Sequence, residues 1–155
     1  MQTHVIEVGY KKEFFDATGN STLSDIKEDL LIDSVSEVKY SELFKIKSDL
    51  SIEEVKKIAS ELCTDKVVQE FSLNEDLRKG FDWIIEVNFH ADVTDNIGII
   101  AKEGIQDLLE KDVSVRTARK YYLKGSLTES DAKKIGEGLL ANSIIEDFKA
   151  LKGKK

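Results

Sequence analysis

The sequence has no proline, one cysteine, two histidines and no long run of apolar residues. Because Cys63 is the only thiol, an internal disulfide is excluded, and the Cys and His residues are too few for an all-Cys/His zinc site. No apolar stretch approaches the ~18 residues of a membrane-spanning helix, so we expect no membrane partner. The first residues lack the basic and apolar regions of a signal peptide, which favours a cytoplasmic protein.

The charge of the chain is unevenly distributed. The net charge of −7 over 155 residues argues against nucleic acid as a partner. Residues 1–76 hold 9 basic and 17 acidic side chains, whereas residues 77–155 hold 14 basic and 13 acidic ones. All the arginines, Arg78, Arg116 and Arg119, lie in the second half. Either both halves carry ordinary solvated surfaces, or the two halves face different neighbours.

The two halves of the chain are related as repeats. A shift of 79 residues places Ile6-Glu7-Val8 on Ile85-Glu86-Val87. After a two-residue deletion the shift becomes 77, and Lys56-Lys57-Ile58 then aligns with Lys133-Lys134-Ile135. A single deletion with matches toward both ends indicates a tandem duplication.

The first repeat predicts the element order β-α-β(β)-α-β. Alternating apolar residues indicate a strand over 6–10, and helical spacing indicates a helix over 23–30. Residues 38–46 are extended, either as one long strand or as two strands joined by a bulge. A second helix over 51–62 and a short strand over 67–71 complete the repeat.

The second repeat predicts the same elements. They are a strand over 85–89, a helix over 97–108, an extended stretch over 113–123, a helix over 128–139 and a strand over 144–148. The extended stretch again alternates without a glycine or another strong turn signal, so one long strand or two bulge-joined strands are both open.

The repeats define the expected fold class and domain organisation. We expect an α+β protein with a first repeat at 1–73, a linker at 74–80, a second repeat at 81–151 and a polar tail at 152–155. A unit of ~75 residues buries too little apolar surface to be stable alone. Because the linker is short, the repeats must be neighbours, and we expect them to pack as an intramolecular pseudo-dimer.

Helix starts carry repeated motifs. Capping boxes at Ser51-Ile52-Glu53-Glu54 and Thr128-Glu129-Ser130-Asp131 open the second helix of each repeat. Asp16-Ala17-Thr18-Gly19 and Asp95-Asn96-Ile97-Gly98 place an acid and a glycine before the first helix of each repeat. By themselves these last motifs indicate a capped loop.

The end of the second repeat is unusual in composition. Residues 139–148 read Leu-Leu-Ala-Asn-Ser-Ile-Ile-Glu-Asp-Phe, in which Asn142 suits the C-terminal end of a helix. Gly136 and Gly138 lie inside the helical pattern, where each glycine costs about 1 kcal/mol relative to alanine. Close packing against another backbone would offset that cost.

Few residues suggest catalysis. His90 with Asp92 or Asp95 is either an acid/base or metal site or a solvated histidine at a strand end. Cys63 aligns with Leu140, which favours a core thiol over a nucleophile. Glycine-rich phosphate loops and the G-x-S-x-G motif are absent. We therefore expect no catalytic residue, metal or cofactor in this chain.

The motifs resemble those of the PurS subunit of phosphoribosylformylglycinamidine (FGAM) synthase. That family combines an alternating strand, Asp-Pro-x-Gly before a helix, Val-Arg-x-Gly-Lys, and the ending Leu-Leu-x-Asn-Pro-x-Ile-Glu-Asp-Tyr. Residues 95–98, 115–120 and 139–148 follow this order. Asn96 and Ser143 replace the family prolines, and the glycine of the middle motif is missing. The first repeat keeps the skeleton with weaker motifs.

The resemblance implies a non-catalytic subunit of de novo purine biosynthesis. FGAM synthase converts formylglycinamide ribonucleotide to formylglycinamidine ribonucleotide with ATP and glutamine. A PurS-type subunit bridges the glutaminase (PurQ) and the synthetase (PurL) and assists ammonia transfer, while ATP and magnesium belong to the synthetase. In the large fused enzyme, an N-terminal region looks like two PurS units in tandem, as here.

The resemblance also suggests residues at the partner interfaces. These are Asp95, Gly98, Arg116, Arg119, Lys120 and Asn142. The alternative for the arginines is a solvated strand edge. The sequence leaves open which repeat contacts which partner, whether the extended strand is swapped between repeats, and whether the pseudo-dimer associates further.

Two other functions compete with this interpretation. Paired α+β units also occur as regulatory modules, which bind an amino acid or a nucleotide at the repeat interface. An enzyme that uses His90 with Asp92 or Asp95 is the third hypothesis.

Overall fold

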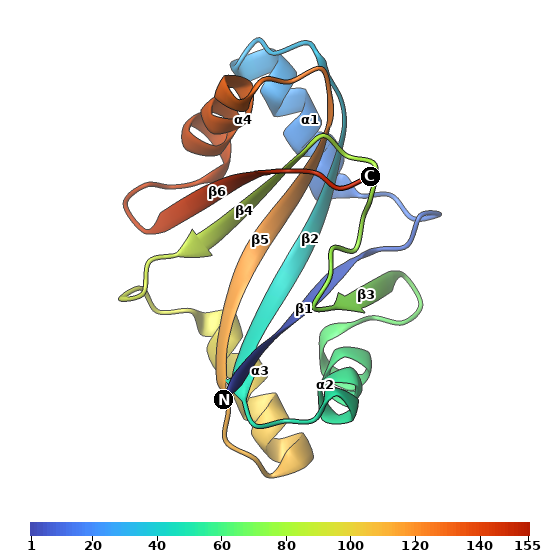
Figure 1. Cartoon of the computed structure of the whole chain (residues 1–155), viewed down its shortest axis with the longest axis vertical. Coiled ribbons are helices and arrows are strands. Elements are labelled where there is room, and N and C mark those ends of the chain that lie inside the picture. The colour runs from blue at the N-terminus through green and yellow to red at the C-terminus, as the bar shows by residue number, and fades with distance from the viewer. The chain divides into compact units, whose positions relative to one another are not determined.

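The computed structural model describes residues 1–155 and confirms the α+β class, with a six-stranded antiparallel sheet and four α-helices (Figure 1). Along the chain the elements are β1 (Gln2–Tyr10), α1 (Ala17–Asp29), β2 (Val35–Ser48), α2 (Ile52–Ile58), η1 (Ala59–Cys63), β3 (Gln69–Leu73), β4 (Trp83–Phe89), α3 (Asn96–Leu109), β5 (Ser114–Gly125), α4 (Glu129–Ile135), η2 (Gly136–Leu140) and β6 (Glu146–Lys152). The segments η1 and η2 are π-helical and continue α2 and α4 directly. The element order of the first half of the chain recurs in the second half.

The sheet has the strand order β3-β1-β2-β5-β4-β6. In the antiparallel pair β1–β3, Val8 lies opposite Phe71, and in the pair β4–β6, Val87 lies opposite Phe148. These are equivalent positions under the sequence repeat. Each extended stretch is one long strand, 14 residues in β2 and 12 in β5.

The second helix of each half begins at its predicted capping box. Ser51 Oγ accepts a hydrogen bond from the Glu54 amide (3.2 Å), and Glu54 Oε1 accepts one from the Ser51 amide (3.0 Å). Thr128 and Asp131 form the same reciprocal pair. Each box satisfies amides that the first turn leaves without an intrahelical partner.

No helix in the chain combines the length and apolar character needed to cross a membrane.

Contacts divide the chain into two compact units. Each unit combines segments from both halves of the chain, so that α3 belongs to unit 1 and α1 to unit 2. The long strands β2 and β5 contribute residues to both units. Unit 1 comprises Met1–Phe14, Glu42–Leu77 and Thr94–Ala118, and unit 2 comprises Phe15–Ser41, Arg78–Val93 and Arg119–Lys155.

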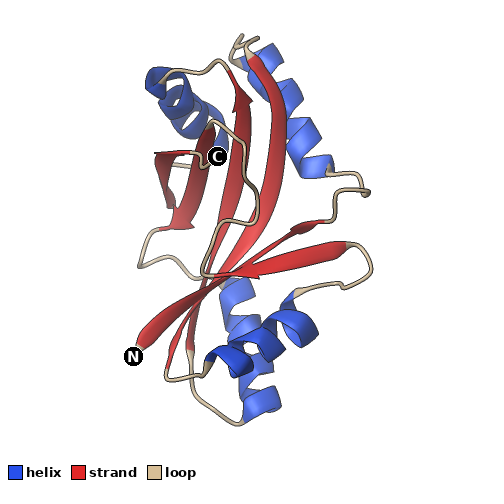
Figure 2. Cartoon of the chain, turned by 45° about the vertical axis from the view of Figure 1, so that its right-hand side comes forward, coloured by secondary structure: helices blue, strands red, loops and turns tan.

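Unit 1 has a single apolar core. Alternate residues of β1, the second part of β2 and the first part of β5 pack against α2, η1 and α3. In this unit α3 lies beside η1 (Figure 2). The fully buried members include Ile6, Ile46, Val55, Ile58 and Ala59. Their burial is the main contribution to the stability of this unit.

Unit 2 has two apolar clusters. The larger one joins α1, β4, α4 and η2 and contains Ile26, Ile85, Leu123, Ala132 and Ile135. The smaller one contains Phe81, Ile84 and Tyr122, with the Phe81 and Tyr122 ring centroids 5.5 Å apart. In the larger cluster the rings of Tyr40 and Tyr121 lie 5.2 Å apart.

The last strand of each repeat begins two residues later than predicted. Val67 and Ile144 lie in turns and are largely exposed, although the apolar pattern placed them in strands. Asp65 Oδ1 accepts a hydrogen bond from the Val67 amide, and Asn142 Oδ1 accepts one from the Ile144 amide, both at 3.1 Å. Asp65 and Asn142 thus bind amides that would otherwise donate to a neighbouring strand, so the strands begin later.

Close packing surrounds Gly136, as predicted, but the neighbour is a side chain. A Cβ atom on Gly136 would lie 2.5 Å from the ring of Phe148. The glycine therefore admits an aromatic ring of β6 against η2. The equivalent residue of the first repeat is Ala59, which is fully buried.

Candidate functional site

Asp95 joins the start of α3 to β5 in unit 1. Its Oδ1 accepts a hydrogen bond from the Gly98 amide (2.9 Å), and its Oδ2 accepts one from the Thr117 amide (2.6 Å). The Thr117 hydroxyl also donates to Asp95 Oδ1 (2.8 Å). A Cβ on Gly98 would lie 2.8 Å from the carbonyl oxygen of Val115, so this close helix–strand approach requires glycine.

Asp16 does the same in unit 2. Its carboxylate accepts hydrogen bonds from the amides of Gly19 and Tyr40, each at 2.8 Å. A Cβ on Gly19 would lie 2.5 Å from the Val38 carbonyl oxygen. Because both copies of the motif share this geometry, its contacts explain Asp95 and Gly98 from within the chain. A role of these two residues at a partner interface stays a prediction.

Arg119 and Asn142 meet at Glu146 in unit 2. Arg119 Nη2 donates to Glu146 Oε2 (2.7 Å) and to the Leu140 carbonyl (3.0 Å), while its Nη1 donates to the Tyr121 hydroxyl (3.0 Å). The other oxygen, Glu146 Oε1, accepts from the Asn142 amide (2.9 Å). We call Arg119, Tyr121, Asn142 and Glu146 the arginine cluster. It ties β5 to the end of η2 and to the start of β6.

Burial and neighbouring groups shift the pKa values of Arg119 and Tyr121 in the arginine cluster. Burial opposes the charged form of Arg119, but the pKa of Arg119 is raised because Tyr121 and the Glu146 carboxylate favour the guanidinium. Burial raises the pKa of the Tyr121 hydroxyl, which therefore stays protonated. Glu146 is 8% exposed, and its carboxylate is held by both Arg119 and Asn142. We interpret the arginine cluster as a set of contacts that stabilises the fold, and not as a proton-transfer site.

Arg116 and Lys120 lie apart from this cluster. Arg116 is half-buried on β5 in unit 1, whereas Lys120 is buried in unit 2 with its Nζ 5.0 Å from the centroid of the Tyr122 ring. Unit 1 thus holds Asp95, Gly98 and Arg116, and unit 2 holds the other three predicted interface residues. Their involvement in partner binding stays a prediction.

Sequence reasoning missed Glu146 and Thr117 as partners of the predicted residues. Glu146 stands within the closing motif, and its position next to a turn-forming Asn142 was the available signal. The equivalent turn in unit 1 is built the same way, because Gln69 Oε1 accepts from the Asp65 amide (2.9 Å).

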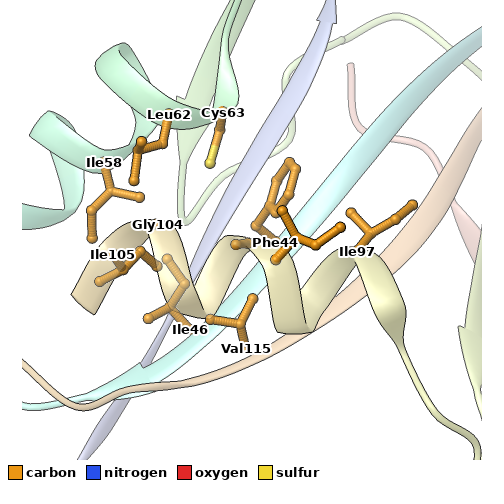
Figure 3. Close-up of a pocket in the computed structure, with 11 residues that line it drawn as sticks. Phe44, Ile46, Ile58, Leu62, Cys63, Ile97, Gly104, Ile105 and Val115 are labelled. Carbon is orange, nitrogen blue, oxygen red and sulfur yellow. The ribbon is translucent and has the colours of Figure 1, made fainter. Parts of the chain in front are cut away.

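An apolar pocket of about 300 Å³ lies in unit 1 between α3 and η1 (Figure 3). Figure 3 shows Ile58 and Leu62 directed from the α2–η1 helix toward α3. The lining contains no charged side chain and consists of Phe44, Ile46, Ile58, Leu62, Cys63, Ile97, Ile100, Ala101, Gly104, Ile105 and Val115.

Cys63 is a poor nucleophile in this pocket. Burial, with a further contribution from the nearby charge of Glu42, raises the pKa of the thiol to about 12. Burial also raises the pKa of the Glu42 carboxyl. A thiol with such a pKa is protonated at neutral pH, in agreement with the interpretation of Cys63 as an inert thiol.

His90 pairs with a residue that the sequence did not suggest. Its Nε2 lies 3.2 Å from Oδ1 of Asp147, a largely exposed side chain, in unit 2. Asp95, one of the two expected partners, belongs to unit 1 and is bound by Gly98 and Thr117. No group of three His, Cys, Asp or Glu side chains is arranged to hold a metal ion.

Comparison of the sequence with protein-family models and with curated proteins found no match. The features that distinguish the units are the arginine cluster in unit 2 and the apolar pocket in unit 1.

Proposed function

We propose that this chain is a non-catalytic subunit that resembles PurS and bridges the glutaminase and synthetase subunits of an FGAM synthase. The observation that carries the proposal is the closing motif of residues 139–148, in which the Glu146 carboxylate accepts hydrogen bonds from both the Asn142 amide and Arg119. A cytoplasmic location and a role in purine biosynthesis belong to the same proposal.

The strand order supports a pseudo-dimer of two repeats. Under the sequence repeat, β1, β2 and β3 are equivalent to β4, β5 and β6. The order β3-β1-β2-β5-β4-β6 then reads the same from either edge of the sheet. Two copies related by a twofold axis that pair through β2 and β5 would give this order.

A fused pair differs from a symmetric dimer in having two surfaces that can diverge. A symmetric dimer presents identical surfaces, whereas here equivalent positions hold Arg119 and Glu42, or Ile100 and Ser21. Such divergence suits a subunit that contacts two different enzymes. We propose that one surface faces the glutaminase and the other the synthetase.

The test is an amidine-forming assay with the synthetase and glutaminase of the same organism, with and without this chain. We expect formation from glutamine, ATP and formylglycinamide ribonucleotide to require the chain, and formation from free ammonia to proceed without it. If neither rate changes and the chain does not co-elute with either enzyme, the purine assignment is wrong.

A regulatory binding module is the second candidate, favoured by a polar cleft of about 560 Å³ in unit 2. The cleft is lined by acidic and basic side chains, among them Asp82, Glu129, Lys152 and Lys155. Charges of both signs suit a zwitterionic or multiply charged small ligand. Calorimetry of the chain with free amino acids and nucleotides tests this candidate, which fails if no heat of binding is observed.

A further inference from the structure

The start of α3 exposes large apolar side chains beside the unit 1 pocket. Ile97 and Ile100 are 59% and 68% exposed, and Leu62 across the pocket is also exposed. We call Leu62, Ile97 and Ile100, together with the pocket they border, the α3 groove. Water within the groove finds few polar partners, so an apolar group that replaced it would bind favourably.

The fold itself does not require this apolar surface. Under the repeat, Ile97 and Ile100 of α3 are equivalent to Thr18 and Ser21 of α1, and Gly104 is equivalent to Asp25. Thr18 and Ser21 are exposed in unit 2, where α1 begins with the same Asp–Gly arrangement. The apolar residues are therefore specific to one copy, which points to a ligand that contacts unit 1 through α3.

The edges of the α3 groove are acidic. Glu103 and Asp107 are exposed and follow Ile100 and Gly104 by three residues on α3, which places them on the adjoining face of the helix. Glu61 is exposed next to Leu62, and Glu42 lies close enough to Cys63 to raise the pKa of its thiol.

Few cations offset these acids. Lys57 precedes Glu61 by four residues on the α2–η1 helix, and Lys102 of α3 is paired with Asp112 at 3.6 Å. Unit 1 as a whole carries 16 acidic and 10 basic side chains. An apolar floor with an acidic rim is complementary to a helix that has an apolar face flanked by cations.

We infer that the α3 groove docks a basic amphipathic helix of a partner protein. One or more large apolar side chains of that helix enter the pocket between α3 and η1, and its lysines or arginines face Glu42, Glu61, Glu103 and Asp107. A fatty-acid carboxylate would be repelled by these acids, and a second copy of this chain would bring two acidic rims together.

The probe is a synthetic helical peptide of about 18 residues, long enough to form a stable helix on binding, with leucine at positions i, i+3, i+4 and i+7 and lysine elsewhere. A second peptide has glutamate in place of lysine. Each is titrated into the ¹⁵N-labelled full chain while amide shifts are followed. We expect the lysine peptide to shift amides of α3 and η1 and the glutamate peptide to leave them unchanged.

The matched variant is Ile97→Thr with Ile100→Ser, which installs the residues that α1 already has. It keeps every charge and should weaken binding of the lysine peptide about tenfold or more, since two exposed apolar contacts are lost. Ile144→Ser, in a turn of unit 2 where the side chain is 82% exposed, is the control and should bind as the parent chain does.

Three results would overturn the inference. The first is equal binding of both peptides, or binding that Ile97→Thr/Ile100→Ser leaves unchanged. The second is saturable binding of decanoate at the α3 groove without binding of the lysine peptide, which would make the groove a lipid site. The third is a concentration-dependent dimer of the chain that the double variant abolishes, which would make the groove a self-association surface.

Discussion

Where the second helix of each repeat meets the sheet, equivalent positions of the two units hold side chains of different charge. Unit 2 has Arg119 bound to Glu146, whereas unit 1 has Glu42 and Gln69 at the same places. The turn that follows the helix is nevertheless the same, because Asp65 with Gln69 reproduces the hydrogen bonds of Asn142 with Glu146. Side-chain oxygens that accept from backbone amides thus define the shared turn, and the charge of the accepting side chain differs between the two copies.

The divergence changes which side chains surround each junction. In unit 2, Tyr121 of the arginine cluster accepts from Arg119 and packs against the ring of Tyr40. In unit 1, Phe44 stands where unit 2 has Tyr121 and Thr117 where it has Tyr40, and an apolar pocket lies beside Cys63. The apolar pocket thus lies in the unit that lacks the ion pair and one of the two rings.

The largest expected effect concerns Cys63, which stands where unit 2 has Leu140. A shift of the thiol pKa from 9.0 to about 12 lowers the thiolate fraction at pH 8 about a thousandfold. A thiolate of higher pKa is also more nucleophilic, so we expect iodoacetamide to alkylate Cys63 of the folded chain more than about tenfold slower than Cys63 of the urea-unfolded chain. Equal rates in both states would contradict the buried environment of the thiol.

The next largest effect is the loss of stability on replacing Asp95, compared with the loss on replacing Asp16. Asp95→Ala removes a helix cap and leaves a strand amide without its partner, so we expect a loss of about 3 kcal/mol in the free energy of unfolding. Asp16→Ala should cost less, because Asp16 lacks the bond that the Thr117 hydroxyl gives Asp95. Urea unfolding of the variants measures both, with Thr117→Val as the control that removes the hydroxyl bond alone.

Arg119→Ala tests the arginine cluster. Removing the guanidinium leaves Glu146 buried without its cation, and we expect a loss of about 2 kcal/mol in the free energy of unfolding, since the pair is only partly buried. The matched change in unit 1, Glu42→Ala, removes a lone carboxylate and should change stability little. If both variants unfold at the same urea concentration, the two junctions are energetically alike and the contrast is wrong.

The smallest effect is the pH dependence contributed by Glu42. Because burial raises the pKa of this carboxyl in the folded chain, the folded state binds more protons than the unfolded state as pH rises above the ordinary value of 4.5, and stability falls. Glu42→Gln should therefore raise Tm slightly at pH 7. The gain should disappear as pH drops below 4.5, which thermal melts at both pH values can establish.

The sequence predicted those parts of the fold that local rules control. The capping boxes at Ser51 and Thr128 were predicted from four residues each, because a cap depends only on its own turn. The α+β class and the repeated element order followed from apolar spacing. The exposure of Val67 and Ile144 was missed, because an apolar pattern does not reveal that a side chain two residues earlier takes the strand's amide.

Contacts between distant residues were less accessible to sequence reasoning. The glycine of each Asp-x-x-Gly motif was interpreted as part of a capped loop, but its necessity comes from a strand carbonyl some 20 residues away. Likewise the partner of Arg119 could not be chosen among the acids of the chain without the fold that brings Glu146 to it. The pocket beside α3 was not predicted, since its walls come from β2, η1, α3 and β5 together.

Each unit is built from three segments that are far apart in the chain, which delays completion of both cores during protein synthesis. Unit 1 needs Thr94–Ala118 and unit 2 needs Arg119–Lys155, so neither core is complete until most of the chain has left the ribosome. An emerging first repeat lacks α3, against which α2 and η1 pack. Many native contacts join residues far apart in the chain, which slows folding relative to a protein built from consecutive domains. The chain should therefore fold as one cooperative whole after translation, and neither repeat should acquire its native core when expressed alone.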